Sequence, residues 1–181
     1  MACLLTSGRL LDCKDGVGGI RSIMLVQNAL YKTSGPIYSA NGELTGFTAA
    51  AQAYRYDLPK HTANFSEGIV VSVENGTVFY EDTLVIKLHK LDAAMRNELK
   101  LIAQNRLTIF VLDNNNNQWT FGELLGAELT AGTASTGTTL GDSNSYDLTF
   151  VSQEREPMRF AGTFTTTPFD NITNLTETPA Y

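Results

Sequence analysis

An Asn75-Gly76 pair between two apolar runs is the feature that most constrains the fold. Alternate positions from Ile69 to Val73 are apolar, and apolar or β-branched residues continue after the pair to Leu88. Asn-Gly is typical of a two-residue type I′ turn, because both central residues of that turn have positive φ. The pattern predicts a hairpin over Phe65–Leu88. A hairpin alone is marginal in water, so the rest of the domain or a neighbouring subunit must cover it.

The composition also favours strands. Charged residues make up only 18% of the 181 residues, below the usual quarter, and much of the remainder is Thr, Ser, Asn and Gly. Thr suits strands, whereas Asn and Gly suit turns. A chain of this length is expected to form about one domain with its own core. Further strands are predicted at 20–26, 106–113, 146–151 and 159–164, with a strand pair or one bent strand over 119–130 and a loop over 28–46. The run at 106–113 is continuously apolar, so both of its faces are expected to be buried.

One segment is ambiguous and another is clearly helical. The alanines after Phe47 fit a helix, but Tyr54–Asp57 alternates like a strand that stops at Pro59. Asp92 is a suitable N-cap for a helix over 92–104. Four apolar residues fall on one stripe of that helix, which we expect to pack on the domain's own sheet rather than in a partner's groove: Leu91, Met95, Leu99 and Ile102.

These patterns predict a mainly β protein, an antiparallel β-sandwich or barrel with one packed α-helix, a long hairpin and extended N- and C-terminal arms. The expected divisions are an N-terminal arm over residues 1–19, a β domain over 20–164 and a C-terminal tail over 165–181. The small, polar segment 131–144 cannot bury enough apolar area to offset its ordering entropy, so we expect it to be mobile in a free subunit.

No convincing set of catalytic or metal-binding residues is found, so we expect neither an enzyme nor a cofactor. Cys3 and Cys13, either paired or free, cannot form a zinc site with the distant His61 and His89. No apolar run is long enough to span a membrane, and the start of the chain lacks the charged region of a signal peptide, so assembly in a cytoplasm is expected.

Two weaker signals are also set aside. The segment 113–124 begins like a calcium loop, but it has Gln118 at the sixth position and Leu124 at the twelfth, where Gly and Glu are needed. Trp119 fits a sugar platform or a core position, and the core is favoured.

The net charge of −6 gives the chain no drive to bind phosphates. It fits a surface that DNA passes without sticking, and also ordinary solubility.

The order of elements resembles the tail tube fold of tailed phages and related injection machines. The similarity is carried by a strand, a long hairpin, one helix and further strands, and in the C-terminal half by the runs 119–129, 142–150 and 156–160. The N-terminal run from Cys3 to Ile20 is similar to the start of structural proteins of phages that infect Bacteroidetes bacteria. The resemblance implies a virion subunit that closes into a hexameric ring, with rings stacked into a tube that conducts DNA, assembled in the host and contacting other tail or neck proteins.

The resemblance also implies roles for particular residues. The hairpin would form an inner barrel between subunits through Phe65, Ile69, Val71, Asn75, Gly76, Phe79, Leu84 and Ile86. Candidates for lining a lumen that repels DNA are Glu67, Glu74, Glu81 and Asp82. The loop 131–145 would bridge rings through Gly132, Thr136, Gly137, Gly141 and Asp142. Long apolar strand edges need partners, and ring closure supplies them. The competing interpretation is a monomeric β-sandwich that binds a carbohydrate or receptor.

Overall fold

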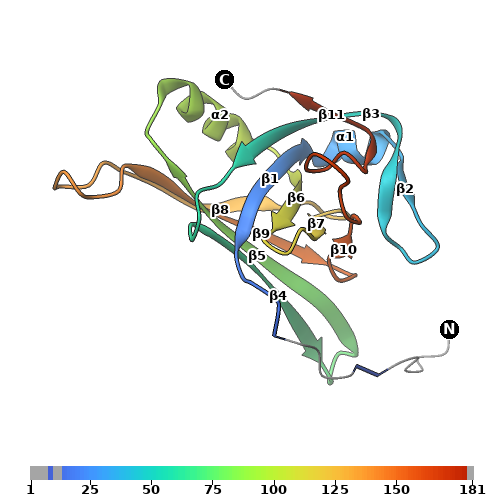
Figure 1. Ribbon diagram of the computed structural model, residues 1–181. Helices are drawn as coiled ribbons and strands as arrows, with labels where there is room; N and C mark the ends of the chain where they lie inside the picture. The colour runs from blue at the N-terminus through green and yellow to red at the C-terminus, as the bar shows by residue number, and fades with distance from the viewer. Residues whose placement is uncertain (1–7, 10–13, 179–181) are drawn as a thin grey trace.

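The computed structural model describes residues 8–9 and 14–178, and the chain path is shown in Figure 1. Cys3, Cys13 and the rest of 1–7 and 10–13 in the expected N-terminal arm lie outside the described residues. The elements in chain order are β1 (Ile20–Gln27), α1 (Asn28–Thr33), β2 (Pro36–Tyr38), β3 (Leu44–Asp57), β4 (Ala63–Ser72), β5 (Thr77–His89), α2 (Ala93–Gln104), β6 (Leu107–Asp113), β7 (Gln118–Phe121), β8 (Glu128–Ser135), β9 (Ser145–Glu154), β10 (Arg159–Phe160) and β11 (Thr173–Thr178).

The strands form two sheets that curl into a half-barrel. The larger sheet has seven strands in the order β10-β7-β6-β1-β3-β11, with β2 also paired to β3. The smaller sheet has the order β4-β5-β9-β8. Every pairing is antiparallel except that of β11 with β3. With 51% of residues in strands and 11% in helices, the predicted mainly β, antiparallel fold is confirmed.

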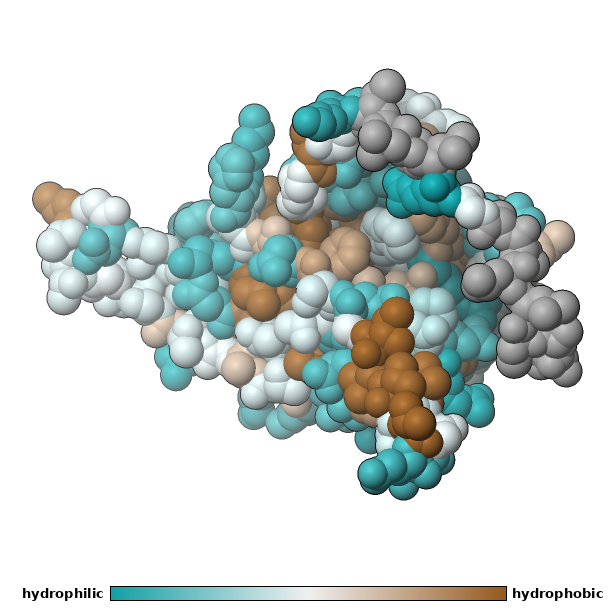
Figure 2. Space-filling view, turned by 90° about the horizontal axis from the view of Figure 1, so that it is seen from below, coloured by the Kyte–Doolittle hydropathy of each residue, from teal (hydrophilic) through white to brown (hydrophobic). Residues whose placement is uncertain are grey.

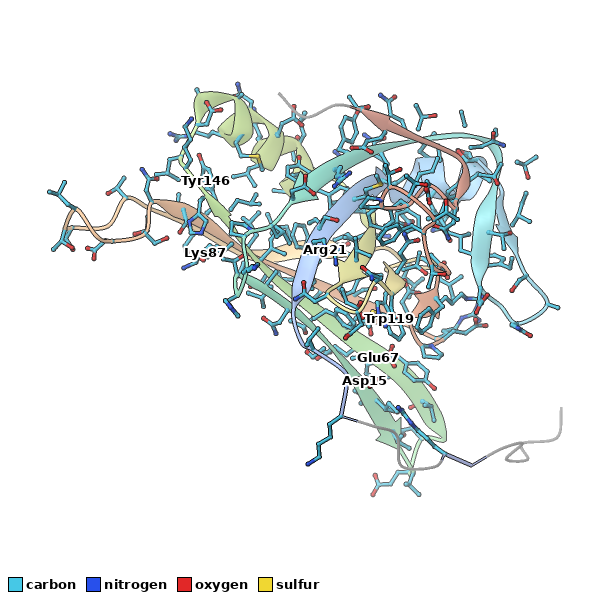
Figure 3. The ribbon with its side chains drawn as sticks, in the orientation of Figure 1. Asp15, Arg21, Glu67, Lys87, Trp119 and Tyr146 are labelled. Carbon is cyan, nitrogen blue, oxygen red and sulfur yellow. The ribbon has the colours of Figure 1, made fainter. Side chains whose placement is uncertain are left out.

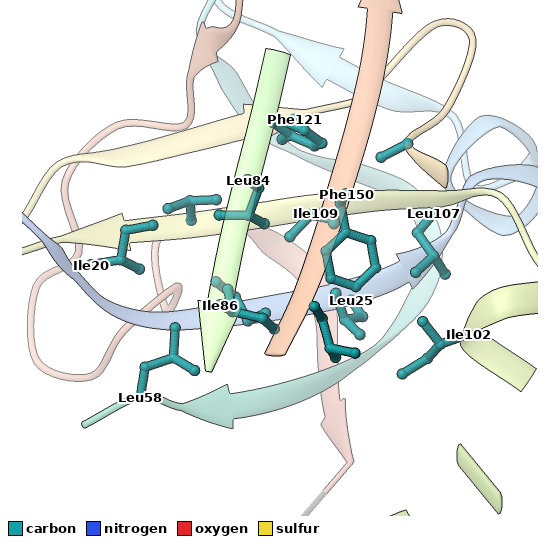
Figure 4. Packing of buried hydrophobic residues seen from close by; sticks show 14 of the residues in the cluster. Ile20, Leu25, Leu58, Leu84, Ile86, Ile102, Leu107, Ile109, Phe121 and Phe150 are labelled. Atoms are coloured by element: carbon teal, nitrogen blue, oxygen red, sulfur yellow. The ribbon is translucent and has the colours of Figure 1, made fainter. Parts of the chain in front are cut away.

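The main core lies between the two sheets, as Figure 4 shows from close by. Leu25 and Ile109 come from the larger sheet and face Leu84, Ile86 and Phe150 from the smaller one, and each of these five side chains is at most 5% exposed. Burial of one such side chain stabilises the fold by about 1.5–3 kcal/mol. The smaller sheet is therefore firmly attached where it overlaps the larger sheet.

A second cluster covers the other face of the larger sheet. Phe110 of β6 packs there with Tyr31 of α1 and with Phe47 of β3, whose ring meets that of Tyr31 edge to face at 5.3 Å. The strand β6 is therefore buried on both faces, as its continuous apolar run predicted. The helix α2 is also confirmed. Asp92 accepts a hydrogen bond from the backbone N–H of Ala94 at 3.2 Å, and the predicted apolar stripe packs on the main core.

The segment 28–46 is not a simple loop, because it contains α1 and β2. The helix α1 has no side-chain hydrogen bond at its N-cap, and its first residue instead makes hydrogen bonds to distant parts of the chain. The buried amide of Asn28 donates hydrogen bonds to Thr108 Oγ1 at 2.9 Å and to the carbonyl oxygen of Gly122 at 3.1 Å. These contacts lie 80 or more residues away in sequence, so no local pattern indicates them.

The C-terminal region adds detail to the expected extended tail over 165–181 and differs from the expected strand over 159–164. The strand β10 has only two residues, and Gly162 then adopts φ of 73°, which ends the extended conformation. In the tail, the Asp170 carboxylate accepts hydrogen bonds from the backbone N–H groups of 165–167, and β11 then joins the larger sheet. Gly46 allows this pairing, because a Cβ there would lie 2.9 Å from the carbonyl oxygen of Thr173.

The alanine-rich segment after Phe47 belongs to one continuous strand, β3. Ala51 and Ala53 are fully buried at the pairing with β11, where they lie opposite Leu175 and Glu177. Small side chains are needed at this crowded position, which is why helix-favouring alanines occur in a strand. Tertiary packing here outweighs their intrinsic helix propensity.

Candidate assembly surface

The predicted hairpin is present, with a different turn. The strands β4 and β5 pair from Ala63 opposite Ile86 to Ser72 opposite Thr77, so the connection is a four-residue loop, 73–76. The predicted two-residue type I′ turn at Asn75-Gly76 is therefore wrong. Only Gly76 of the pair has positive φ, at 63°. The backbone N–H of Asn75 instead donates to Ser72 Oγ at 3.3 Å, a local bond that supports the longer loop.

The hairpin has a half that the domain covers and a half that it does not. On its covered half, β5 pairs with β9 from His89 opposite Ser145 to Tyr80 opposite Glu154, where β9 ends. Beyond that point, over Thr77–Phe79, β5 pairs only with β4, and the segment 69–79 is what we call the free half of the hairpin. In Figure 1 this free half extends away from the body of the molecule as a two-stranded ribbon.

The free half is apolar on both faces. Val71 lies directly opposite Val78, and these side chains are 57% and 52% exposed, with Ile69 on the same face at 65%. The other face carries the opposed pair Val70 and Phe79, of which Val70 is 39% exposed. Figure 2 shows a compact hydrophobic group at the near end of the molecule, bordered by hydrophilic residues. A contiguous exposed patch of this kind is typical of an interaction surface.

The residues expected at a subunit interface therefore divide into two sets. Leu84 and Ile86 belong to the protomer's own core, and half-buried Phe65 lies 5.9 Å from the ring of Trp119. The exposed or partly exposed set is Ile69, Val71, Asn75, Gly76 and Phe79. Period-two alternation finds which residues share a face. It does not show where along the hairpin the pairing with β9 ends.

The smaller sheet ends in two edge strands, β4 and β8. Neither strand contains Lys or Pro, two residues that commonly block unwanted pairing at a sheet edge. The side chains of β8 are mostly small and exposed. Within the described residues, neither edge therefore has Lys or Pro to block pairing, but β4 carries the inward-pointing Glu67 and β8 has a register shift between Leu129 and Ala131.

The four acidic residues expected to line a lumen do not share one surface. Glu67 lies directly opposite Asp82, so these two side chains project from the core-facing side of the smaller sheet. Glu81 projects from the other side and accepts a hydrogen bond from Gln153 Nε2 at 2.8 Å. Glu74 is exposed in the connecting loop. Asp82 is only 1% exposed, so its expected place in a lumen is corrected.

The acidic residues on the core-facing side belong to a polar cluster at the base of the hairpin. Figure 3 labels Glu67 there, just below Trp119. Its Oε2 accepts a hydrogen bond from the backbone N–H of Met158 at 2.7 Å. Glu154 Oε1 accepts hydrogen bonds from the backbone N–H groups of Leu124 and Leu125 at 3.0 and 2.9 Å, which fixes the turn before β8. Neither oxygen of Asp82 has a hydrogen-bond partner.

A second part of this cluster links α1, the segment after β7 and β10. Tyr31 donates a hydrogen bond to Glu123 Oε1 at 2.6 Å, and Arg159 forms an ion pair with Glu123 Oε2 at 3.1 Å. Burial raises the pKa of Glu123, while Tyr31 and Arg159 oppose that rise. Arg159 also pairs with Glu156 and lies 4.6 Å from the ring centre of Tyr38. The arrangement stabilises the buried carboxyl group of Glu123.

The segment expected to bridge rings is partly a strand. Gly132 lies in β8 opposite Leu148, so the loop begins after Ser135 and not at 131. Thr136, Gly137, Gly141 and Asp142 lie in the loop itself. There the Asp142 carboxylate accepts hydrogen bonds from the backbone N–H groups of Thr138 and Thr139, both at 2.7 Å, which holds the pKa of Asp142 well below its usual value. The loop projects at the far left in Figure 1.

Trp119 is part of the core region and not a platform. Its ring centre lies 4.1 Å from that of Phe160 and 5.9 Å from that of Phe65. Among residues 8–9 and 14–178, no group of His, Cys, Asp and Glu has the arrangement of a metal site. In the same part of the chain, none of the helices has the length and apolar character needed to cross a bilayer.

Comparisons with known proteins give one distant likeness. No protein-family model and no curated protein matches the chain. Among solved structures, the chain is similar to one chain of a structure described as the virion of a native gene transfer agent (GTA) particle, with 11% identity and a TM-score of 0.35 over 56% of this chain and 84% of the other. A TM-score at this level does not establish a common fold, so no function is assigned from it.

Proposed function

We propose that this protein is a structural subunit that assembles with copies of itself and has no enzymatic activity. The observation that carries the proposal is the free half of the hairpin, where Ile69, Val71 and Val78 are each more than half exposed. Exposed apolar strands of this length carry a risk of uncontrolled aggregation unless a partner covers them. A second copy of the same chain supplies such a partner in every cell that makes the protein.

The assembly we propose is a closed ring. The smaller sheet has one edge at β4 and another at β8. Pairing of β4 in one copy with β8 in the next makes the sheet continuous between subunits, and closure of the ring leaves no edge exposed. This contact is heterologous, because two different surfaces meet, so it forms either a ring or an open filament.

The more specific proposal is a phage tail subunit in hexameric rings that stack into a tube. It rests on the resemblance of the element order to tail tube proteins. In such a tube the outward face of the smaller sheet would line a channel for DNA. That face carries Glu81, and its Lys87 is paired with Asp147 at 3.2 Å, so it offers phosphates little attraction. Other tail or neck proteins would contact the ends of the stack.

The carbohydrate-binding alternative has less support. It requires an exposed aromatic platform, whereas Trp119, the candidate for one, is partly buried and lies against Phe65 and Phe160. Negative-stain microscopy and mass photometry of the purified protein, recorded over a range of concentrations, distinguish the two functions. Rings or tubes of defined subunit number support the assembly proposal. A protein that stays monomeric at high concentration and binds a glycan would overturn it.

A further inference from the structure

A buried carboxyl group lies where the covered half of the hairpin meets its free half. Asp82 is 1% exposed, and both of its side-chain oxygens lack a hydrogen-bond partner. On the same face of β5, Leu84 on one side is fully buried, whereas Val78 toward the tip is 52% exposed. Asp82 is therefore the last side chain of β5 that the protomer fully covers on this face.

The groups that face Asp82 are mostly acidic and come from every element packed against it. From β4 comes Glu67, directly opposite, and from β9 come Ser152, directly opposite, and Glu154, two residues further along. From the larger sheet and the segment before β10 come three residues that line the same small cavity: Glu123, Glu156 and Arg159. One guanidinium thus lies among five carboxyl groups.

The donors around this cavity are already engaged with other acceptors. Arg159 pairs with Glu123 and with Glu156. The hydroxyl of Ser152 donates to Glu154 Oε1 at 3.4 Å. The cavity measures about 10 Å³, which is room for at most about one water molecule. An ionised Asp82 would therefore be a buried charge with neither a partner nor a solvation shell, which is strongly unfavourable.

We propose that Asp82 is a proton switch at the base of the hairpin, which holds the end of the hairpin from Asp82 to the tip against the body when protonated and releases that end when ionised. The protonated carboxyl group is neutral and has one O–H donor. Carboxylate acceptors on the same face of the sheet are Glu67, directly opposite on β4, and Glu154, two residues beyond the β9 residue opposite Asp82. Release exposes Asp82 to water, where its charge is stable. The switch acts on the element that carries the exposed apolar surface.

The direction of the pH dependence follows from the position of Asp82. Burial, followed by the negative charges of Glu67 and Glu154, raises the pKa of Asp82 to about 7 from 3.8. In a released hairpin the pKa returns toward the lower value. The closed arrangement is therefore most favoured below about pH 4, loses its advantage as the pH rises, and is least favoured above pH 7. Protonation of Asp82 thus changes within the range found in cells.

Carboxyl-carbon NMR titration and amide hydrogen exchange test this inference on the protomer, whether or not it assembles. We expect the Asp82 carboxyl group to titrate above pH 6. We also expect the opening equilibrium of the β4 and β5 amides to increase at least about tenfold between pH 5.5 and 8.5, after correction for intrinsic exchange, since one pKa unit corresponds to a factor of ten. Asp82→Asn should abolish that increase.

Glu81→Gln is the matched control, because it removes a charge from the adjacent residue on the opposite, exposed face. It should keep the pH-dependent opening. Titration of Asp82 below pH 5, or pH-dependent opening that persists in Asp82→Asn, would overturn the inference. If Asp82→Asn does not fold, the titration of the unaltered protein decides alone. Failure of the protein to form rings would overturn the proposed function and leave this result unaffected.

Discussion

Val71 of β4 lies directly opposite Val78 of β5, and both side chains are more than half exposed. The same face of the same hairpin carries Leu84, which is fully buried further along β5. One continuous apolar face is thus covered at one end and open at the other. Folding of the protomer accounts for the covered end, and the open end is where we place the contact between copies.

This division predicts different costs for two truncations in one hairpin. Leu84→Ala should lower the free energy of unfolding by about 2–5 kcal/mol, because it leaves a cavity between the two sheets. Ile69→Ala, at a side chain 65% exposed, should change it by less than about 0.5 kcal/mol. Urea unfolding of the monomer measures both values. Equal losses would show that the free half is covered within the protomer.

Removal of the Arg159 side chain is expected to make stability more dependent on pH. Glu123 is buried with a raised pKa, and Arg159 is the cation that opposes the rise. In Arg159→Met the pKa of Glu123 should rise further. The contribution of Glu123 to stability should then be greatest at low pH. It should decline more steeply than in the unaltered protein as the pH rises through the folded-state pKa of Glu123. Thermal unfolding from pH 4 to 8 gives the two profiles, and parallel profiles would contradict the proposed role of Arg159.

Asp170 should have the opposite pH dependence. Its carboxylate accepts hydrogen bonds from the backbone N–H groups of 165–167, which holds its pKa well below the usual value. The stabilisation is present above the unfolded pKa and is lost as the pH falls through the folded one. Asp170→Ala should therefore destabilise the attachment of β11 at pH 7 and have a smaller effect as the pH falls. Hydrogen exchange of the β11 amides at pH 7 should be faster in the variant.

The edge strands give a prediction about assembly. Thr133→Lys places a charged side chain on the exposed edge strand β8 and should weaken association between copies at least about tenfold, as lysine does at natural edges. Thr176→Lys is the matched control, because Thr176 is an exposed threonine on β11, the edge strand of the larger sheet. Sedimentation velocity compares the two. Equal association of both variants would exclude β8 as the contact.

Much of the fold is readable from local patterns, and the misses share a cause. The helix α2 has a cap and an apolar stripe, and β6 has a continuous apolar run, so both are predicted well. The elements α1, β2 and β11 depend on partners far along the chain, such as Thr108 for Asn28. Local periodicity contains no information about such contacts.

For the candidate site, the sequence predicts the hairpin but not how much of it the domain covers. The covered length depends on where the pairing of β5 with β9 ends, which is at Glu154. The burial of Asp82 did have a signal, since Asp82 alternates in step with Leu84 and Ile86 and therefore belongs on their face. An acidic residue in such a series indicates either a partner or a raised pKa; neither oxygen of Asp82 has a hydrogen-bond partner, and burial raises its pKa.

Mass photometry of Val71→Glu beside Leu101→Glu tests the central claim most directly. Both substitutions place a charge on an exposed apolar residue, at 57% exposure on the hairpin and at 52% on α2. The account predicts that the unaltered protein and Leu101→Glu form the same oligomer, while Val71→Glu is folded and monomeric. Oligomers of equal size and stability in all three proteins would show that the exposed face of the hairpin is not the contact between copies.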